Sequence, residues 1–91
     1  MIIVSQGKTA HINYDNIEAT YLLKKDDKIQ INMRGNYDYT IGEYETMERA
    51  KEVLQEIVKA TIETRKSQEL NNLFGGAGII PSNTYYEMPE D

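Results

Sequence analysis

A glycine-rich stretch near the C-terminus holds the residues whose types best suit ligand chemistry. Gly75 and Gly76 follow Phe74 directly. Successive glycines let backbone N–H groups converge on an anion, and a phenylalanine ring offers a flat face for a nucleobase. Because the glycines follow a helix-like segment and do not precede one, they match neither a P-loop nor a dinucleotide fingerprint. The composition of this stretch therefore favours a nucleotide pocket, but without a specific motif.

Two polar residues before the stretch and one after it could complete such a pocket. Arg49 and Arg65 precede it, and a guanidinium group can bind phosphate through two parallel hydrogen bonds. Asn83 follows it and carries an amide that could read a ribose hydroxyl or a base edge. A second interpretation stays open, in which the glycines only end a helix and the tail docks through its apolar residues. These apolar residues are Ile79, Ile80 and Met88.

The sequence offers no set of residues for catalysis. It has no cysteine, and its one histidine, His11, has no obvious catalytic partner. No serine lies in a nucleophile elbow, and no nucleophile, base and orienting group come together. We expect His11 to be a solvent-facing strand residue and the protein to be non-enzymatic, without metal or cofactor.

Length and charge exclude several functional classes. The chain has 91 residues, of which 40% are hydrophobic and 27% charged, as in a soluble globular domain. Fifteen Asp and Glu against ten Lys and Arg give a net charge of -5, which disfavours binding to nucleic acid phosphates. The longest apolar runs, residues 1–4 and 75–81, are too short for a membrane span or a secretory signal. We expect one cytoplasmic domain over residues 1–91, with neither nucleic acid nor membrane as a partner.

The first half of the chain has the alternation of short β-strands. Apolar residues recur with period two in four segments, and an apolar β-branched run precedes them at residues 1–5. The four segments are residues 10–14, 17–23, 29–33 and 37–41. Between the first two, Asp15-Asn16 has the spacing of a two-residue hairpin. The pattern predicts an antiparallel meander of about five short strands over residues 1–44, with one apolar face.

Tyrosine dominates the aromatic residues, with seven Tyr, one Phe and no Trp. Four tyrosines fall on the apolar face of the predicted meander, together with Leu23, and should be core or interface residues. They are Tyr14, Tyr21, Tyr37 and Tyr39. The others lie outside that pattern, and we expect them at protein interfaces because tyrosine is large, rigid and amphipathic. They are Tyr44, Tyr85 and Tyr86.

The period changes to that of a helix at Thr46, which is placed to cap the first turn. We expect a helix over residues 46–74, and its 28 residues from Met47 to Phe74 would be about 42 Å long, whereas a domain of this size has a radius of gyration of only about 12 Å. It should therefore break near residues 67–71 or project and pack on another subunit. Its apolar stripe, widened by Val58 and Ile62, is broad enough to face both the sheet and a second copy, so we expect a homo-oligomer. With a glycine-rich loop and extended tail over residues 75–91, the predicted fold class is α+β.

Four short strings in the sequence resemble small proteins of phages and prophages in Gram-positive bacteria. They are MIIVSQ at residues 1–6, NYDN at 13–16, ERAKEVL at 48–54 and YEMPE at 86–90. Within that group, a strand meander followed by a long helix is similar to the phage-encoded anti-Thoeris nucleotide sponges. The resemblance implies a homo-oligomer that sequesters a cyclic ADP-ribose isomer in the host bacterial cytoplasm, without catalysis. It also implies ligand-binding roles for Arg49, Phe74 and Asn83.

The residues and the resemblance together favour a phage anti-defence protein that captures a cyclic nucleotide at a subunit interface. In this hypothesis Phe74 stacks on the base and the arginines bind phosphate, while the glycine backbone lines the pocket. The alternative is an acidic protein-binding inhibitor or adaptor, comparable to an anti-CRISPR protein, and its motivation is the net charge of -5. A purely structural phage or plasmid component is a third possibility, and it predicts oligomers without a ligand.

Overall fold

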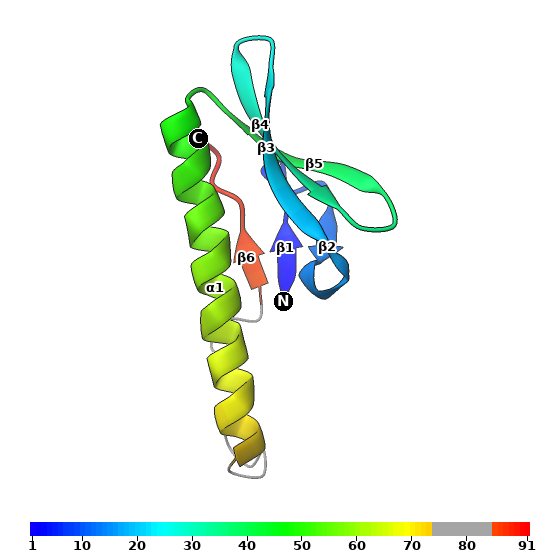
Figure 1. Ribbon diagram of the computed structural model, residues 1–91, viewed down its shortest axis with the longest axis vertical. Coiled ribbons are helices and arrows are strands. Elements are labelled where there is room, and N and C mark those ends of the chain that lie inside the picture. The colour runs from blue at the N-terminus through cyan, green and yellow to red at the C-terminus, as the bar shows by residue number, and fades with distance from the viewer. Residues whose placement is uncertain (74–84) are drawn as a thin grey trace.

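Within residues 1–73 and 85–91, the part that the structure describes, the chain forms two three-stranded sheets and one long helix (Figure 1). The structure is a computed structural model, and it describes side chains as far as Lys66 and again from Tyr85. The elements are β1 (Ile2–Val4), β2 (His11–Asn13), the 3-10 helix η1 (Tyr14–Asn16), β3 (Ala19–Lys25), β4 (Lys28–Arg34), β5 (Asp38–Tyr44), α1 (Met47–Leu73) and β6 (Tyr85–Glu87). The α+β prediction is confirmed, because the strands of the first half are followed by one helix.

The strands that were predicted as one series are divided between two sheets. β3, β4 and β5 form an antiparallel meander, in which each strand pairs with the next. The other sheet has the order β2-β1-β6, with β1 antiparallel to β2 and parallel to β6. β6 comes from the tail, and Met88 just beyond it is buried in the core. The tail therefore docks through Met88, whereas Ile79 and Ile80 lie outside the described residues.

The two-residue hairpin predicted at Asp15-Asn16 is wrong. These residues belong to η1, and the strands before and after it, β2 and β3, lie in different sheets. The Asn13 side chain caps η1, since its Oδ1 accepts a hydrogen bond from the Asp15 backbone N–H at 3.1 Å. A side chain that bonds the backbone two residues further on competes with strand pairing. The chain therefore leaves the first sheet here instead of folding back on β2.

The side of β3 that faces the core also differs from the prediction. Leu22 lies opposite Ile31 and packs against the core, while Leu23 is exposed. Ile17 packs against the core from a position before the strand begins. The single alternation predicted for residues 17–23 is therefore interrupted at the start of β3, and within the strand Leu22 and not Leu23 faces the core.

A β-bulge changes the pattern again in β5. The register shifts by one residue between the pairs Ile31–Gly42 and Asn32–Thr40. An extra residue moves all following side chains to the other face. As a result Tyr44 is a core residue with 2% of its surface exposed, whereas it was predicted outside the apolar face. Tyr37 precedes the strand and is 72% exposed, so of its two predicted places, core or interface, the core is excluded.

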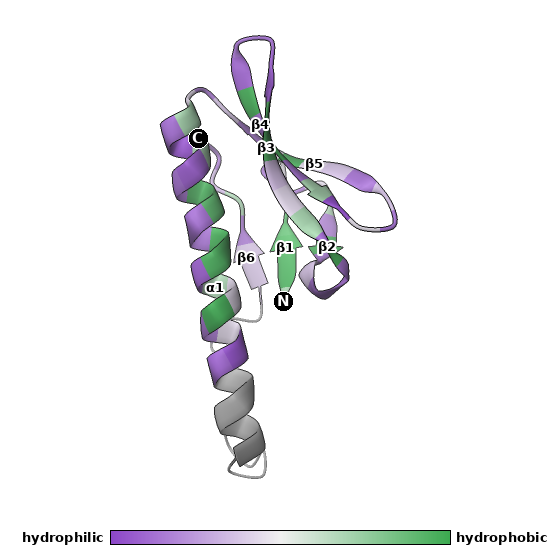
Figure 2. Cartoon of the chain, in the orientation of Figure 1, coloured by the Kyte–Doolittle hydropathy of each residue, from purple (hydrophilic) through white to green (hydrophobic). Residues whose placement is uncertain are grey.

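The core lies where α1 meets the sheets. Its helical side consists of Ala50, Val53 and Ile57, which are three and four positions apart and all buried. Figure 2 shows the hydrophobic character of β1 and the alternation of hydrophobic and hydrophilic residues along α1. The strands contribute Ile3, Ile12, Ile29, Ile31, Met33, Ile41 and Tyr44. The helix runs without a break through residues 67–71 and extends beyond both sheets (Figure 1).

Candidate functional site

Helix α1 carries both arginines that were predicted to bind phosphate, but it holds them far apart. Thr46 caps the first turn as predicted, with its Oγ1 accepting a hydrogen bond from the Arg49 backbone N–H at 3.1 Å. Arg65 lies 16 positions after Arg49. At a rise of about 1.5 Å per residue, the two positions are about 24 Å apart along the helix. One phosphate group therefore cannot contact both arginines of the same subunit.

The Arg49 guanidinium is bonded to groups of its own chain. Its Nε donates to the backbone oxygen of Asp91 at 3.0 Å, and its Nη1 lies 3.1 Å from a carboxylate oxygen of Glu52. The sequence also suggests an ion pair between Arg49 and Glu45, four positions earlier, but Glu45 lies 3.6 Å from the Nζ of Lys28. Glu45 precedes the helix, so the spacing that brings residues four apart together on a helix does not apply to it. Two of the five N–H donors of Arg49 are therefore already used within its own chain.

The cleft beside Arg49 is acidic. It has a volume of about 390 Å³, and its lining holds four carboxylate side chains against two cationic ones. The carboxylates repel a phosphate group because both are negatively charged. The two cations already have carboxylate neighbours. The lining residues are Gln6, Lys28, Glu43, Tyr44, Glu45, Arg49, Glu90 and Asp91. The charge of this cleft therefore disfavours an anionic ligand.

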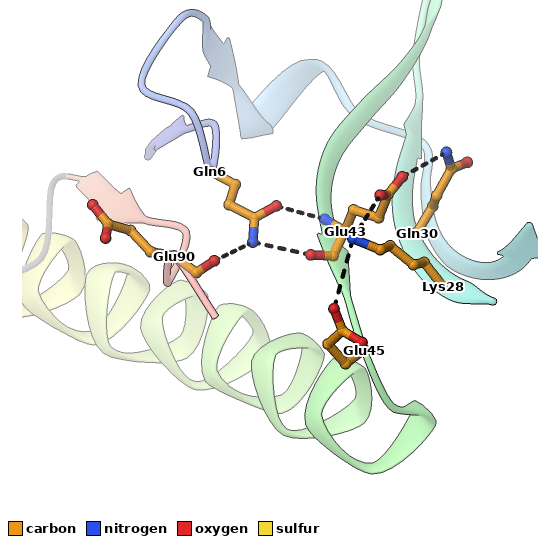
Figure 3. A network of polar contacts seen from close by, with 6 residues as sticks. All are labelled: Gln6, Lys28, Gln30, Glu43, Glu45 and Glu90. Atoms are coloured by element: carbon orange, nitrogen blue, oxygen red, sulfur yellow. Dashed lines mark hydrogen bonds and ion pairs between the residues drawn. The ribbon is translucent and has the colours of Figure 1, made fainter.

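The Gln6 side chain joins three segments at the wall of this cleft (Figure 3). Its Oε1 accepts a hydrogen bond from the Glu43 backbone N–H at 2.7 Å, and its Nε2 donates to the Glu43 backbone oxygen at 3.0 Å. The same Nε2 donates to the backbone oxygen of Glu90 at 2.6 Å. The amide thus pairs with β5 as a residue of a neighbouring strand would, while it also holds the tail beyond β6. We call this arrangement the Gln6 clamp.

Two tyrosine hydroxyls bind the tail to the rest of the fold. Burial raises the pKa of Tyr44 to about 12, and its hydroxyl donates to the backbone oxygen of Pro89 at 2.8 Å. Burial also raises the pKa of Tyr86, and so does its hydrogen bond to the Glu56 carboxylate at 2.6 Å. Both hydroxyls therefore stay protonated at neutral pH and act as hydrogen-bond donors. Their contacts are with the protein itself, which indicates a structural role.

The solvent side of α1 carries an apolar surface that neither sheet covers. Val58 and Ile62 are large and hydrophobic, yet they are 49% and 47% exposed. They line a shallow groove of about 380 Å³ together with Gln55, Lys59, Glu63 and Lys66. Arg65 is exposed near this groove, and none of the ion pairs among the described side chains involves it. Contiguous exposed apolar side chains are typical of surfaces that bind another molecule.

Four of the predicted site residues, Phe74, Gly75, Gly76 and Asn83, lie outside the described residues. In the sequence Phe74 follows Leu73, the last residue of α1. The structure thus describes the surroundings of the two arginines and does not bring them together.

The described residues show neither a metal cluster nor a membrane-spanning helix. In that part of the chain, no three histidine or carboxylate side chains are placed to hold a metal ion. No helix within residues 1–73 and 85–91 combines the length and the apolar character that crossing a membrane requires. His11 is exposed on β2, as predicted.

Sequence reasoning missed the Gln6 clamp, and no local signal could have found it. The bonding partners of Gln6 are 37 and 84 positions away in the sequence.

The chain matches no family model and no curated protein, and its fold matches no solved structure.

Proposed function

We propose that the protein is a non-enzymatic phage anti-defence protein that sequesters a cyclic nucleotide signal, of the cyclic ADP-ribose type, at an interface between its own subunits. The observation that carries this proposal is the uncovered apolar surface of Val58 and Ile62, next to Arg65. A second subunit on this surface would exclude water from the neighbouring guanidinium group. Hydrogen bonds from arginine to phosphate are stronger in such a low-dielectric environment.

Each candidate residue has a distinct role in this proposal. Arg65 binds phosphate, Phe74 stacks on the adenine ring, and Asn83 bonds the ribose, while the glycine backbone lines the pocket. Arg65 is suited to this role because its guanidinium is exposed and unpaired among the described side chains. We assign Arg49 a structural role instead, since its Nε and Nη1 already bond Asp91 and Glu52 of its own chain.

Native mass spectrometry with a panel of cyclic ADP-ribose isomers and cyclic oligonucleotides tests the proposal. We expect an oligomer whose mass increases by that of intact ligand, and ligand recovered unchanged after the protein is denatured. Phe74→Ala should weaken capture by roughly 5- to 100-fold, the usual loss when one base–aromatic stack is removed, and the oligomer should persist. Tyr37→Ala is the matched control, because Tyr37 is an exposed aromatic residue outside the pocket. An oligomer that takes up no member of the panel contradicts the proposal.

The acidic cleft beside Arg49 favours a second candidate, a protein-binding inhibitor or adaptor. Its four carboxylates line one cleft and would suit a basic surface on a partner. Binding through such exposed charges should weaken steeply as salt rises from 0.05 to about 0.5 M, because the Debye length shortens. A nucleotide buried between subunits should instead dissociate at nearly the same slow rate at both salt concentrations.

A further inference from the structure

The uncovered surface of α1 is a row of residues with regular helical spacing. Met47, Leu54, Val58 and Ile62 all lie within about 40° of Val58 around the helix, at 3.6 residues per turn. Three of them are substantially exposed, and Leu54 is half-buried. The intervals of seven and four resemble those of a coiled-coil seam. We call these four residues the outer row.

The outer row is separate from the face of α1 that packs on the sheets. The core face is formed by Ala50, Val53 and Ile57, which lie about 80–140° away from Val58 around the helix. The row therefore has no partner among the described parts of its own chain. A helix with two apolar faces is typical of a subunit that packs one face on its own core and the other on a neighbour.

The charges beside the outer row specify the direction of a partner helix. Glu48 lies near the start of α1, and Lys66 lies 18 positions later on the same flank, five full turns away. None of the ion pairs between described side chains involves either residue. An antiparallel copy would place Glu48 opposite Lys66 of the partner subunit, twice by symmetry. A parallel copy would place the two equivalent flanks on opposite sides of the interface, so Glu48 and Lys66 would find no partner there.

The centres of the charge pair and of the apolar row differ by a single position. Residues 48 and 66 are equidistant from position 57, and Leu54 and Ile62 are equidistant from Val58. Lys51 and Arg65 are each seven positions from Val58, and each lies about 20° from it around the helix, on opposite sides and within the angular range of the outer row. Antiparallel pairing would bring Lys51 of one subunit beside Arg65 of the partner subunit. Among the described side chains, none of the ion pairs involves either cation.

We infer that two copies of the chain pair antiparallel through the outer row, and that Lys51 and the partner's Arg65 together form a phosphate site that is absent from the monomer. Two cations held side by side repel unless an anion lies between them, so the pairing creates the site and a phosphate group strengthens the pairing. The dimer has two such sites. Arg49 takes no part, since nine positions from Val58 are two and a half turns and place it on the opposite side of α1. The identity of the phosphate compound as a captured nucleotide rests on the proposed function, whereas the pairing does not.

The pairing is tested by the molar mass in solution, from light scattering after size exclusion. We expect a dimer for the natural chain, and Val58→Asp with Ile62→Asp should raise its dissociation constant by roughly 100-fold or more, because two apolar anchors are lost. Far-ultraviolet circular dichroism confirms that the variant is folded. Leu23→Asp is the matched control, since Leu23 is an exposed apolar residue on β3. A monomeric natural chain, or a folded double variant that remains as strongly dimeric, overturns the inference.

A charge swap tests the direction of the pairing. Glu48→Lys alone and Lys66→Glu alone should each weaken the dimer, and the two changes together should restore it, because each new charge again meets its opposite. In a parallel dimer residues 48 and 66 do not meet across the interface, so neither single change should weaken it. Failure of the double swap to recover the dimer overturns the antiparallel arrangement.

Inorganic pyrophosphate is the probe for the anion site. It should raise the thermal stability of the natural dimer, and Lys51→Gln or Arg65→Gln should abolish that effect, whereas Lys24→Gln on β3 should not. A dimer that does not respond to pyrophosphate overturns the phosphate site. The folded monomeric Val58→Asp/Ile62→Asp variant should not capture a cyclic nucleotide. If it does, the phosphate site between two subunits is wrong, and only the nucleotide-binding part of the proposed function remains. A pyrophosphate-responsive dimer that captures no nucleotide would contradict the proposed function and support the phosphate site.

Discussion

Replacing Gln6 by alanine should destabilise the fold far more than its position in a surface turn suggests. The Gln6 clamp makes three hydrogen bonds, two to the backbone of Glu43 and one to the backbone of Glu90. Removing the amide leaves one N–H and two carbonyl groups that only water can satisfy. It also removes one of the contacts that hold the tail beyond β6, while the bonds from Tyr44 to Pro89 and from Arg49 to Asp91 remain.

The expected loss follows from the number of bonds and from their exposure. A hydrogen bond contributes about 0.5–1.5 kcal/mol net to protein stability, and water replaces part of that when the groups are accessible. Three bonds at a half-buried residue therefore correspond to about 2 kcal/mol of unfolding free energy. In a domain of this size, such a change lowers Tm by roughly 8–16 °C.

Urea unfolding measures this loss, and amide hydrogen exchange locates it. The Glu43 amide should lose protection in Gln6→Ala, since its acceptor is the Gln6 Oε1. Gln30→Ala is the matched control, because Gln30 also bonds Glu43 but through a single contact of 3.4 Å. Gln6→Glu keeps the length of the side chain and places carboxylate oxygens against two backbone oxygens, so it should destabilise at least as much at neutral pH. Equal stability losses in Gln6→Ala and Gln30→Ala would refute this account of the clamp.

Three further changes give distinct outcomes. Asn32→Val should stabilise by about 1 kcal/mol in urea unfolding, because the buried Asn32 Oδ1 has no hydrogen-bond partner among the described residues. Gly35→Ala should destabilise by about 1–3 kcal/mol, since a Cβ there would lie 2.7 Å from a backbone oxygen of Asn16, whereas Gly7→Ala, with no atom nearer than 3.8 Å, should be nearly neutral. The contribution of Tyr44 to the unfolding free energy should be fully present below about pH 10 and should be lost as pH rises toward 12, because the fold holds the Tyr44 proton more tightly than the unfolded chain does. Tyr44→Phe should reduce that loss, and an unchanged pH profile in this variant would contradict it.

The sequence predicts those parts of the fold in which spacing is regular and local. The helix was expected over residues 46–74 and occupies Met47–Leu73, because its period and its cap at Thr46 are local properties. Ile29, Ile31 and Met33 are buried as their alternation predicts. The two-residue turn between β3 and β4 is also local, since Asp26 adopts the positive φ that such turns require.

The sequence does not predict features that depend on contacts between distant segments. The division into two sheets arises because β6 pairs with β1, and nothing in residues 1–5 indicates that partner. Tyr44 is buried because a bulge in β5 adds one residue before it and so turns its side chain to the core face of the sheet. Of the candidate site, the sequence indicated the arginines by type. It did not indicate that Arg49 bonds the C-terminal segment, which lies 42 positions away.

The pairing of β1 with β6 has a consequence for the order in which the molecule folds. Ile2 lies opposite Tyr85, so 83 positions of chain must be made before these strands can meet. The strands of the β3-β4-β5 meander are joined by short turns and can pair early, because closing a short loop loses less chain entropy. Met88 enters the core only with β6, so a growing chain that ends before Tyr85 has an incomplete core and an unpaired edge on β1. During synthesis the unpaired edge of β1 is open to pairing with another chain. Misassembly and chaperone binding should therefore occur before β6 has been made.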